Sequence, residues 1–279
     1  MKHLSSTSWL LSTLVLLFGC GGGERTSRPN SSPPSGGPAQ GLNGAGNWQC
    51  STTSMAGMPP ATIAGSIAQS GVSVSGAVHV DGSSCFDHLT TVGLSGTLTG
   101  KNISLTSSSI AGQVTTFTGS FSDPGTYSPG QFAGTYTING GCANGDQGNV
   151  TGVKIPYIAN ILNGTFTSSG GGTFDLAGDV AQDASASPAG SFGVSGTATL
   201  TTSCFSSGTI TSGTFPSGSF IVGTSVALEI DTGNGTISFL GTWDLAKGEI
   251  SGIYSVSGGT CDQTGTAVLV ASSPWDYGP

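Results

Sequence analysis

The sequence predicts an all-β protein in which two tandem antiparallel domains follow a leader and a disordered tether. We expect each domain to be a β-barrel or β-sandwich of about seven or eight strands. Three observations support this prediction: period-two alternation, an internal repeat, and glycine-bearing turns about every eight to twelve residues. No stretch after the leader combines sustained helical periodicity with helix-forming residues.

The leader, residues 1–19, has the zones of a bacterial signal peptide, with a positive start and a short apolar run. That run has about ten residues, about half of what a spanning helix needs. It ends in Leu17-Phe18-Gly19-Cys20, which resembles the lipobox of bacterial prolipoproteins. The resemblance implies cleavage before Cys20 and attachment of acyl chains, such as palmitate, to this residue. Because Gly21 rather than Asp follows, it also implies sorting to an outer membrane in a cell that has one.

The chain after Cys20 divides by composition. Residues 20–46 consist almost entirely of Gly, Ser, Pro and small polar residues, which bury too little apolar surface to fold, so we expect a flexible tether. The repeat then gives two β domains, residues 47–160 and 161–273, and a tail, residues 274–279.

Charge excludes one class of partner. The formal net charge is −8, and the basic residues after the tether are Lys101, Lys154 and Lys247. Nucleic-acid binding needs a basic surface that neutralises phosphates, so we expect no nucleic-acid partner.

The repeat is recognised from cysteine spacing. Cys85 and Cys142 are 57 residues apart, as are Cys204 and Cys261. Their flanks match as well, as the following pairs of segments show: Ser84-Cys85-Phe86 with Ser203-Cys204-Phe205, Ala64–Gln69 with Ala177–Gln182, and Phe132–Ile138 with Ile250–Val256. The openings match more loosely, Gly46-Asn47-Trp48 with Gly164-Thr165-Phe166.

An aromatic opening followed by a meander of strands resembles small lipocalin-like barrels at the level of pattern. The part after the tether also resembles secreted tandem-repeat β proteins. These resemblances imply a barrel, and they transfer no ligand-binding residue to this chain.

The remaining cysteines suggest two bridges. Equal spacing favours the disulfides Cys85–Cys142 and Cys204–Cys261, one in each repeat, and export makes their oxidation plausible. Cys50 is left unpaired. The second copy has Ser168 at about that point, so Cys50 is either buried and inert or paired between chains.

Motifs for nucleophilic, phosphate or zinc-protease chemistry are missing from the sequence. His79, Asp81, Asp87 and His88 form one local group of titratable residues, which suggests either a weak metal site or a polar turn. The second copy replaces this group, so the turn is the favoured interpretation. Carboxylates at Glu229, Asp231, Asp244 and Glu249 are candidates for glycoside hydrolysis if they converge.

We therefore expect a membrane-anchored lipoprotein of the cell envelope that binds a ligand or partner and is not an enzyme. We expect no cofactor other than the covalent lipid on Cys20. A small apolar ligand and an envelope protein are the expected partners, besides the membrane itself. Two alternatives stay open: a structural envelope component, and a hydrolase acting on extracellular carbohydrate.

Overall fold

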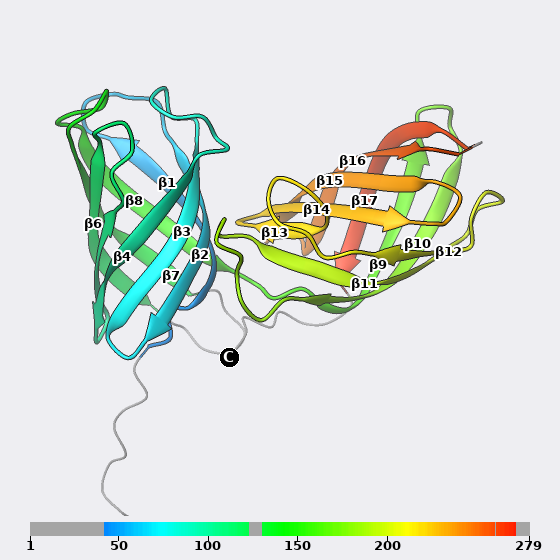
Figure 1. Ribbon diagram of the computed structural model, residues 1–279, viewed down its shortest axis with the longest axis horizontal. Helices are drawn as coiled ribbons and strands as arrows, with labels where there is room; N and C mark the ends of the chain where they lie inside the picture. Colours follow the sequence, from blue (N-terminus) through cyan, green and yellow to red (C-terminus); the bar gives the residue numbers. More distant parts are fainter. Residues whose placement is uncertain (1–41, 123–129, 260, 272–279) are drawn as a thin grey trace, which may run out of the picture. The chain divides into compact units, whose positions relative to one another are not determined.

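Every regular element in the computed structural model is a β-strand, within the residues that it describes: 42–122, 130–259 and 261–271. The leader, Cys20, most of the tether and the tail lie outside the described residues. Figure 1 shows the strands wrapped into two barrels, coloured blue to green and green to red. The prediction of an all-β fold with two tandem antiparallel domains is confirmed, and both are barrels.

The first barrel closes through eight antiparallel strands, each paired with its neighbours in sequence and the last with the first. Its strands are β1 (Gly46–Ser54), β2 (Thr62–Ser70), β3 (Ser73–Asp81), β4 (Thr91–Thr99), β5 (Asn102–Ser107), β6 (Val114–Ser122), β7 (Gln131–Asn139) and β8 (Gln147–Ile155).

The second barrel is a nine-stranded sheet that the pairing of β10 with β11 closes into a ring. The short strand β13 is an addition to this ring, because it pairs with both β11 and β14. The strands are β9 (Ala159–Ser168), β10 (Thr173–Gln182), β11 (Phe192–Leu200), β12 (Ser207–Ile210), β13 (Phe220–Val222), β14 (Ser225–Asp231), β15 (Thr236–Asp244), β16 (Glu249–Ser257) and β17 (Gln263–Ala271).

The connection between the barrels is short. β8 ends at Ile155 and β9 begins at Ala159, so the predicted boundary between residues 160 and 161 falls inside β9. Both barrels belong to one compact unit of the chain.

Over the described ranges, no helix has the length and apolarity to cross a membrane.

Alternation along the strands builds the two cores. In β10, every second residue is buried, beginning with Phe174, Leu176 and Gly178, while the residues between them face solvent. Side chains of a strand point alternately to opposite faces, so this pattern places one face inside the barrel. Each barrel has its own hydrophobic cluster, which contains Trp48 and Tyr136 in the first and Phe166 and Tyr254 in the second.

Both predicted disulfides are present. Cys85 is bonded to Cys142 and Cys204 to Cys261, with Cα–Cα distances of 5.9 and 6.2 Å. The local turns before them agree: the backbone N–H of Cys85 donates to Ser83 Oγ, and that of Cys204 donates to Thr202 Oγ1. Each bridge closes the same separation of 57 residues and so restrains its unfolded barrel to a similar extent.

Strand pairing corrects one part of the expected alignment between the copies. Trp48 pairs with Gly65, whereas Leu162 pairs with Gly178, and these two glycines are matched positions of the repeat. Trp48 therefore corresponds to Leu162 and not to Phe166. The opening segments look alike in sequence, but they differ in register by four residues, the separation of Leu162 from Phe166.

The same register explains Cys50. It corresponds to Gly164, and Ser168 corresponds to Ser54. Cys50 pairs with Gly152 in β8, and a Cβ at Gly152 would collide with its Sγ. In the second barrel the sizes are exchanged: Gly164 pairs with Leu269, whose Cδ2 occupies the space that a Cβ at Gly164 would need.

Candidate ligand-binding cavity in the first barrel

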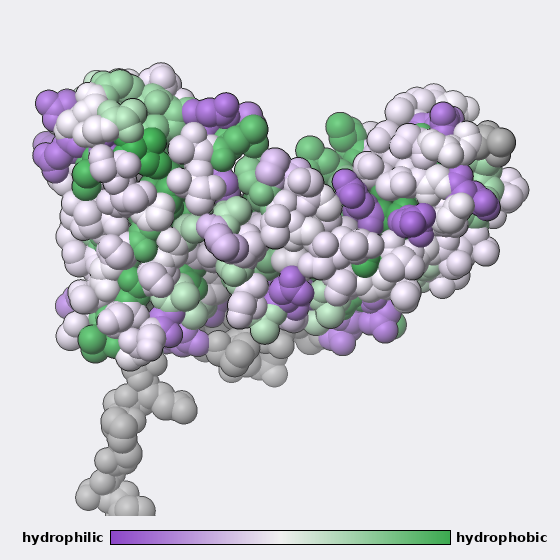
Figure 2. All heavy atoms as spheres, viewed as in Figure 1, coloured by the Kyte–Doolittle hydropathy of each residue, from purple (hydrophilic) through white to green (hydrophobic). Residues whose placement is uncertain are grey.

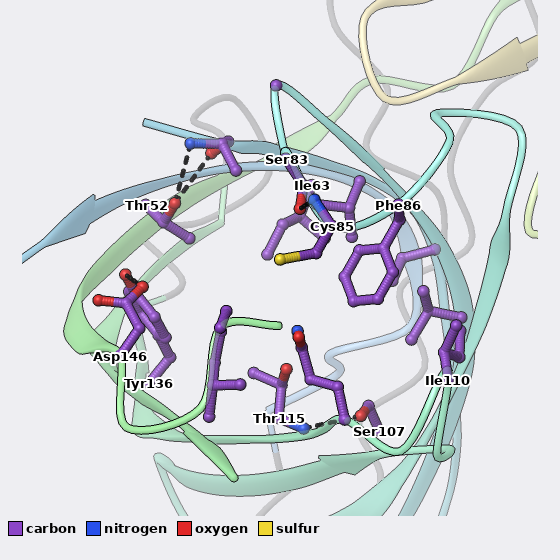
Figure 3. A pocket seen from close by; sticks show the side chains of 18 of the residues that line it. Thr52, Ile63, Ser83, Cys85, Phe86, Ser107, Ile110, Thr115, Tyr136 and Asp146 are labelled. Atoms are coloured by element: carbon purple, nitrogen blue, oxygen red, sulfur yellow. Dashed lines mark hydrogen bonds between the residues drawn. The ribbon is translucent and has the colours of Figure 1, made fainter. Parts of the chain in front are cut away.

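A cavity of about 90 Å³ opens at the disulfide end of the first barrel. Figure 3 looks into it, with Ile63, Phe86 and Tyr136 among the labelled side chains around it. The exposed apolar side chains Met55 and Met58 lie on the turn after β1, and Met58 also lines the cavity. Figure 2 shows hydrophobic residues, in green, gathered at the upper end of this barrel.

The cavity exists because two inward positions carry small side chains. Thr52 and Ala61 both line it, and they are held together by hydrogen bonds, with the Thr52 backbone N–H donating to the Ala61 carbonyl oxygen at 2.9 Å. By strand register, Thr52 corresponds to Phe166 and Ala61 to Phe174. In the second barrel these two phenylalanine rings stack with centroids 4.8 Å apart and fill the corresponding space.

Two further lining positions also differ between the copies, one of them toward a smaller side chain and the other toward a larger one. Thr115, half-buried in the first barrel, corresponds to Ile237, which is fully buried in the second. Gln113, one residue before β6, corresponds to Gly235, one residue before β15. At three of the four positions the first barrel has a smaller side chain than the second, with Thr or Ala in place of Phe and Thr in place of Ile. At the fourth, the first barrel has the amide of Gln113 where the second has a glycine.

Gln113 carries an unsatisfied buried atom. Its side chain is 3% exposed, and its Oε1 has no hydrogen-bond partner. Its backbone is fixed, because Gln113 and Ile110 exchange N–H···O hydrogen bonds of 2.9 and 3.0 Å across a tight turn. A buried acceptor without a partner costs about 1–3 kcal/mol, so Oε1 is expected to accept from a molecule that enters the cavity, either water or a ligand.

A carboxylate with two donors stands at one side of the cavity. Ser54 Oγ donates to Asp146 Oδ1 at 2.6 Å, and the Tyr136 hydroxyl donates to Asp146 Oδ2 at 2.8 Å. Burial, together with the hydrogen bond to Asp146 and its negative charge, raises the pKa of Tyr136 above its usual value. Both oxygens of Asp146 are therefore already engaged, and the tyrosine is held as a neutral donor.

The Cys85–Cys142 disulfide fixes the rim of the cavity. Cys85 and Phe86 line the cavity and lie in the loop between β3 and β4, and Cys142 lies in the turn between β7 and β8. Phe86 is half-buried there, whereas its counterpart Phe205 is buried and packs edge-on against Phe174, with centroids 6.1 Å apart. Without a ring at position 61, Phe86 lacks the packing partner that Phe205 has.

A second apolar hollow of about 50 Å³ lies deeper in the same barrel. It shares Ile63 and Phe117 with the outer cavity and is lined by Cys50 as well. Cys50 forms no disulfide, and desolvation by burial raises the pKa of its thiol from 9.0 to about 12. The thiol is therefore neutral at physiological pH and contributes an apolar surface.

The four residues that the sequence offered as weak candidates for a metal site do not form one group. The buried His79 donates from Nε2 to the Ala189 carbonyl oxygen at 2.7 Å and lies against the ring of Phe215. His88 and Asp87 form an exposed pair, 3.2 Å apart, and Asp81 accepts from the backbone N–H of Gly82. Within the described ranges, no three or more His, Cys, Asp or Glu residues are placed to hold a metal ion.

The carboxylates considered for glycoside hydrolysis are distributed along a hairpin. Asp231 and Asp244 lie at opposite ends of the sheet region formed by β14 and β15, and each accepts backbone N–H groups of its own turn. Asp244 also bonds Lys247 at 2.9 Å, and this partner lowers the pKa of the carboxyl. Glu249 is the cross-strand partner of Asp244, and Glu229 points to solvent.

Comparisons with known proteins add little to this geometry. No family model matches the chain, and a search of curated proteins finds no similar sequence. Among solved structures, the chain has some similarity to a putative AttH from Nitrosomonas europaea, at 10% identity and a TM-score of 0.22, covering 86% of this chain and 99% of that one. Similarity at this level supports no conclusion about function.

Sequence reasoning did not identify Thr52, Ala61, Gln113 and Thr115 as site residues. The signal was present in the repeat, where small or polar residues of one copy oppose aromatic or apolar residues of the other. Reading that signal requires the strand register, because the sequence match of Trp48 with Phe166 places Thr52 four residues away from its true counterpart.

Proposed function

We propose that this chain is a lipid-anchored protein of the cell envelope whose first barrel binds a small apolar molecule. The observation that carries the proposal is the cavity at Thr52 and Ala61, where the second barrel places the stacked rings of Phe166 and Phe174. The second barrel acts as a packed scaffold. An open apolar cavity in one copy also argues against a purely structural role.

The size and lining of the cavity suit a small ligand. The outer and inner hollows, about 90 and about 50 Å³, lie in one barrel and share lining residues. An apolar cavity of roughly 150 Å³ is known to take up benzene and stay free of water. Pockets of this kind combine mostly apolar walls with a few polar groups, which is the composition found here.

Two features support a location at the cell envelope. The resemblance of Leu17-Phe18-Gly19-Cys20 to a lipobox implies a lipid anchor, and disulfide bonds persist in exported proteins more than in cytosolic ones. A carrier or sensor of a small apolar compound at the envelope fits both features. The outer membrane is the favoured site in a cell that has one.

Binding is tested by titrating p-xylene into the lipidated mature chain, which begins at Cys20, in lipid nanodiscs, with empty nanodiscs as the control for partition into lipid. Carbon-13 methyl shifts of Ile63 report on the cavity, since this residue lines both hollows. We expect saturable shifts in the unmodified chain. Ala61→Phe, which restores the residue found at the corresponding position of the second barrel, should abolish them.

Ala133→Phe is the matched control, because it adds the same ring on the exposed outer face of β7. It should leave the Ile63 response unchanged. An unmodified chain with no saturable response, or an Ala61→Phe variant that responds normally, would contradict the proposal. Thermal melts of both variants show whether each is folded.

A further inference from the structure

We infer that Gln113 is the specificity-determining residue of the first barrel and selects a neutral, single-ring ligand that carries a hydroxyl group. The inference rests on the proposed function and names the chemical class of its ligand. Three properties of the site carry it: the shape of the space, the unsatisfied amide, and the distribution of charge.

The shape of the space is inferred from the rings that fill the corresponding space in the second barrel. In the second barrel the corresponding space holds the rings of Phe166 and Phe174, with Tyr254 and Phe205 against Phe174 at centroid distances of 5.7 and 6.1 Å. Tyr136 and Phe86 are the counterparts of these last two residues, and both line the cavity of the first barrel. A planar ring therefore finds two of the three aromatic neighbours that Phe174 has, and takes up space that Phe166 fills in the second barrel.

The amide of Gln113 supplies the polar contact. Its Oε1 is buried without a partner, and the residue lines the cavity beside Ile110 and Thr115. A half-turn of the amide exchanges its oxygen and nitrogen, so either atom can be presented to a ligand. A hydroxyl group both donates and accepts, and it satisfies the amide in either orientation. The corresponding residue of the filled barrel is Gly235, so the amide occurs only in the barrel that has the cavity.

Charge restricts the ligand to neutral molecules. Among the described residues that line the outer cavity, none is Lys, Arg or His, and the one acidic residue is Asp146. A carboxylate ligand would lose its hydration without meeting a cation, and it would be repelled by Asp146. Fatty acids and aromatic acids are therefore selected against, whereas a phenol keeps its hydroxyl hydrogen-bonded.

The test compares three probes of similar shape, p-cresol, p-xylene and p-toluate, each titrated into the lipidated mature chain in nanodiscs. Methyl shifts of Ile63 and Ile110 report binding. We expect p-cresol to bind about tenfold more tightly than p-xylene, the difference that one buried hydrogen bond makes. We expect p-toluate to bind more weakly than either.

Gln113→Met removes the amide at similar volume and should reduce the preference for p-cresol over p-xylene to within about twofold. Gln131→Met makes the same exchange at an exposed position of β7 and should preserve the preference. If p-xylene binds in the cavity but p-cresol has no advantage, or if Gln113→Met keeps that advantage, this inference is wrong and the proposed function stands. If no probe binds, both fail.

Discussion

At the disulfide end of the second barrel, Phe166, Phe174, Phe205 and Tyr254 pack ring against ring, and Phe166 is completely buried. At the same end of the first barrel, Thr52 and Ala61 replace the two central rings, while Tyr136 and Phe86 remain at its wall. The backbones around these positions have the same strand pairing and the same type of disulfide. Two barrels of one design therefore differ in whether this end of the core is filled by rings or left open.

A filled core and an open core meet different demands. A solid core contributes the most to stability, because buried aromatic rings remove large apolar areas from water. A core with an opening gives up part of that contribution and gains a place for another molecule. Under the proposed function, the two demands fall on separate barrels of this chain.

The largest effect is expected from opening the filled barrel. Phe174→Ala removes a ring that contacts three other rings, and should cost the second barrel about 3–5 kcal/mol of unfolding free energy. The reverse exchange, Ala61→Phe, should leave the first barrel about as stable or more so. Urea denaturation read by hydrogen exchange for each barrel measures both, and a loss below about 1 kcal/mol for Phe174→Ala would refute the assigned role of this ring.

Removal of each disulfide tests whether the two barrels depend on their bridges to the same extent. The pairs Cys85→Ala/Cys142→Ala and Cys204→Ala/Cys261→Ala remove bridges of equal span, and each should cost its barrel about 4 kcal/mol in the chain-entropy model. The first pair should also weaken p-cresol binding, since it frees the loop with Phe86. Unchanged binding in a folded first-barrel variant would show that the bridge does not shape the cavity.

The smallest effect concerns Cys50, whose buried thiol has a pKa raised to about 12. Below pH 9 the thiol is protonated in both the folded and the unfolded chain, and it adds no pH dependence. From about pH 9 to about 12 only the unfolded thiol ionises, so the stability of the first barrel should fall.

Measured against Cys50→Ala, this fall should be specific to the first barrel, as Cys50 is the one free cysteine among the described residues. Iodoacetamide should also modify Cys50 slowly at pH 8 until urea unfolds the barrel. Rapid modification of the folded chain would mean that the thiol is accessible.

Much of the fold follows from the sequence, and the reasons are physical. Period-two alternation in segments such as Phe132–Ile138 specifies half-buried strands, and equal cysteine spacing specifies one bridge for each copy. The cavity does not follow in the same way. It depends on which residues of different strands face each other, and the register between β1 and β2 is set by turn length, which differs between the copies. The membrane anchor at Cys20 lies outside the described residues and stays a prediction.

The exchanged sizes at Cys50–Gly152 and Gly164–Leu269 limit how the two barrels could be recombined. A chimera that carries β1 in place of β9 would bring a thiol against the leucine of β17, and the reverse chimera would leave two glycines facing each other. One chimera is overfilled and the other has a hole, although every strand in them is native to the chain. At this contact β1 is matched to β8 and β9 to β17, so a chimera that keeps the contact has to exchange both strands of the pair together.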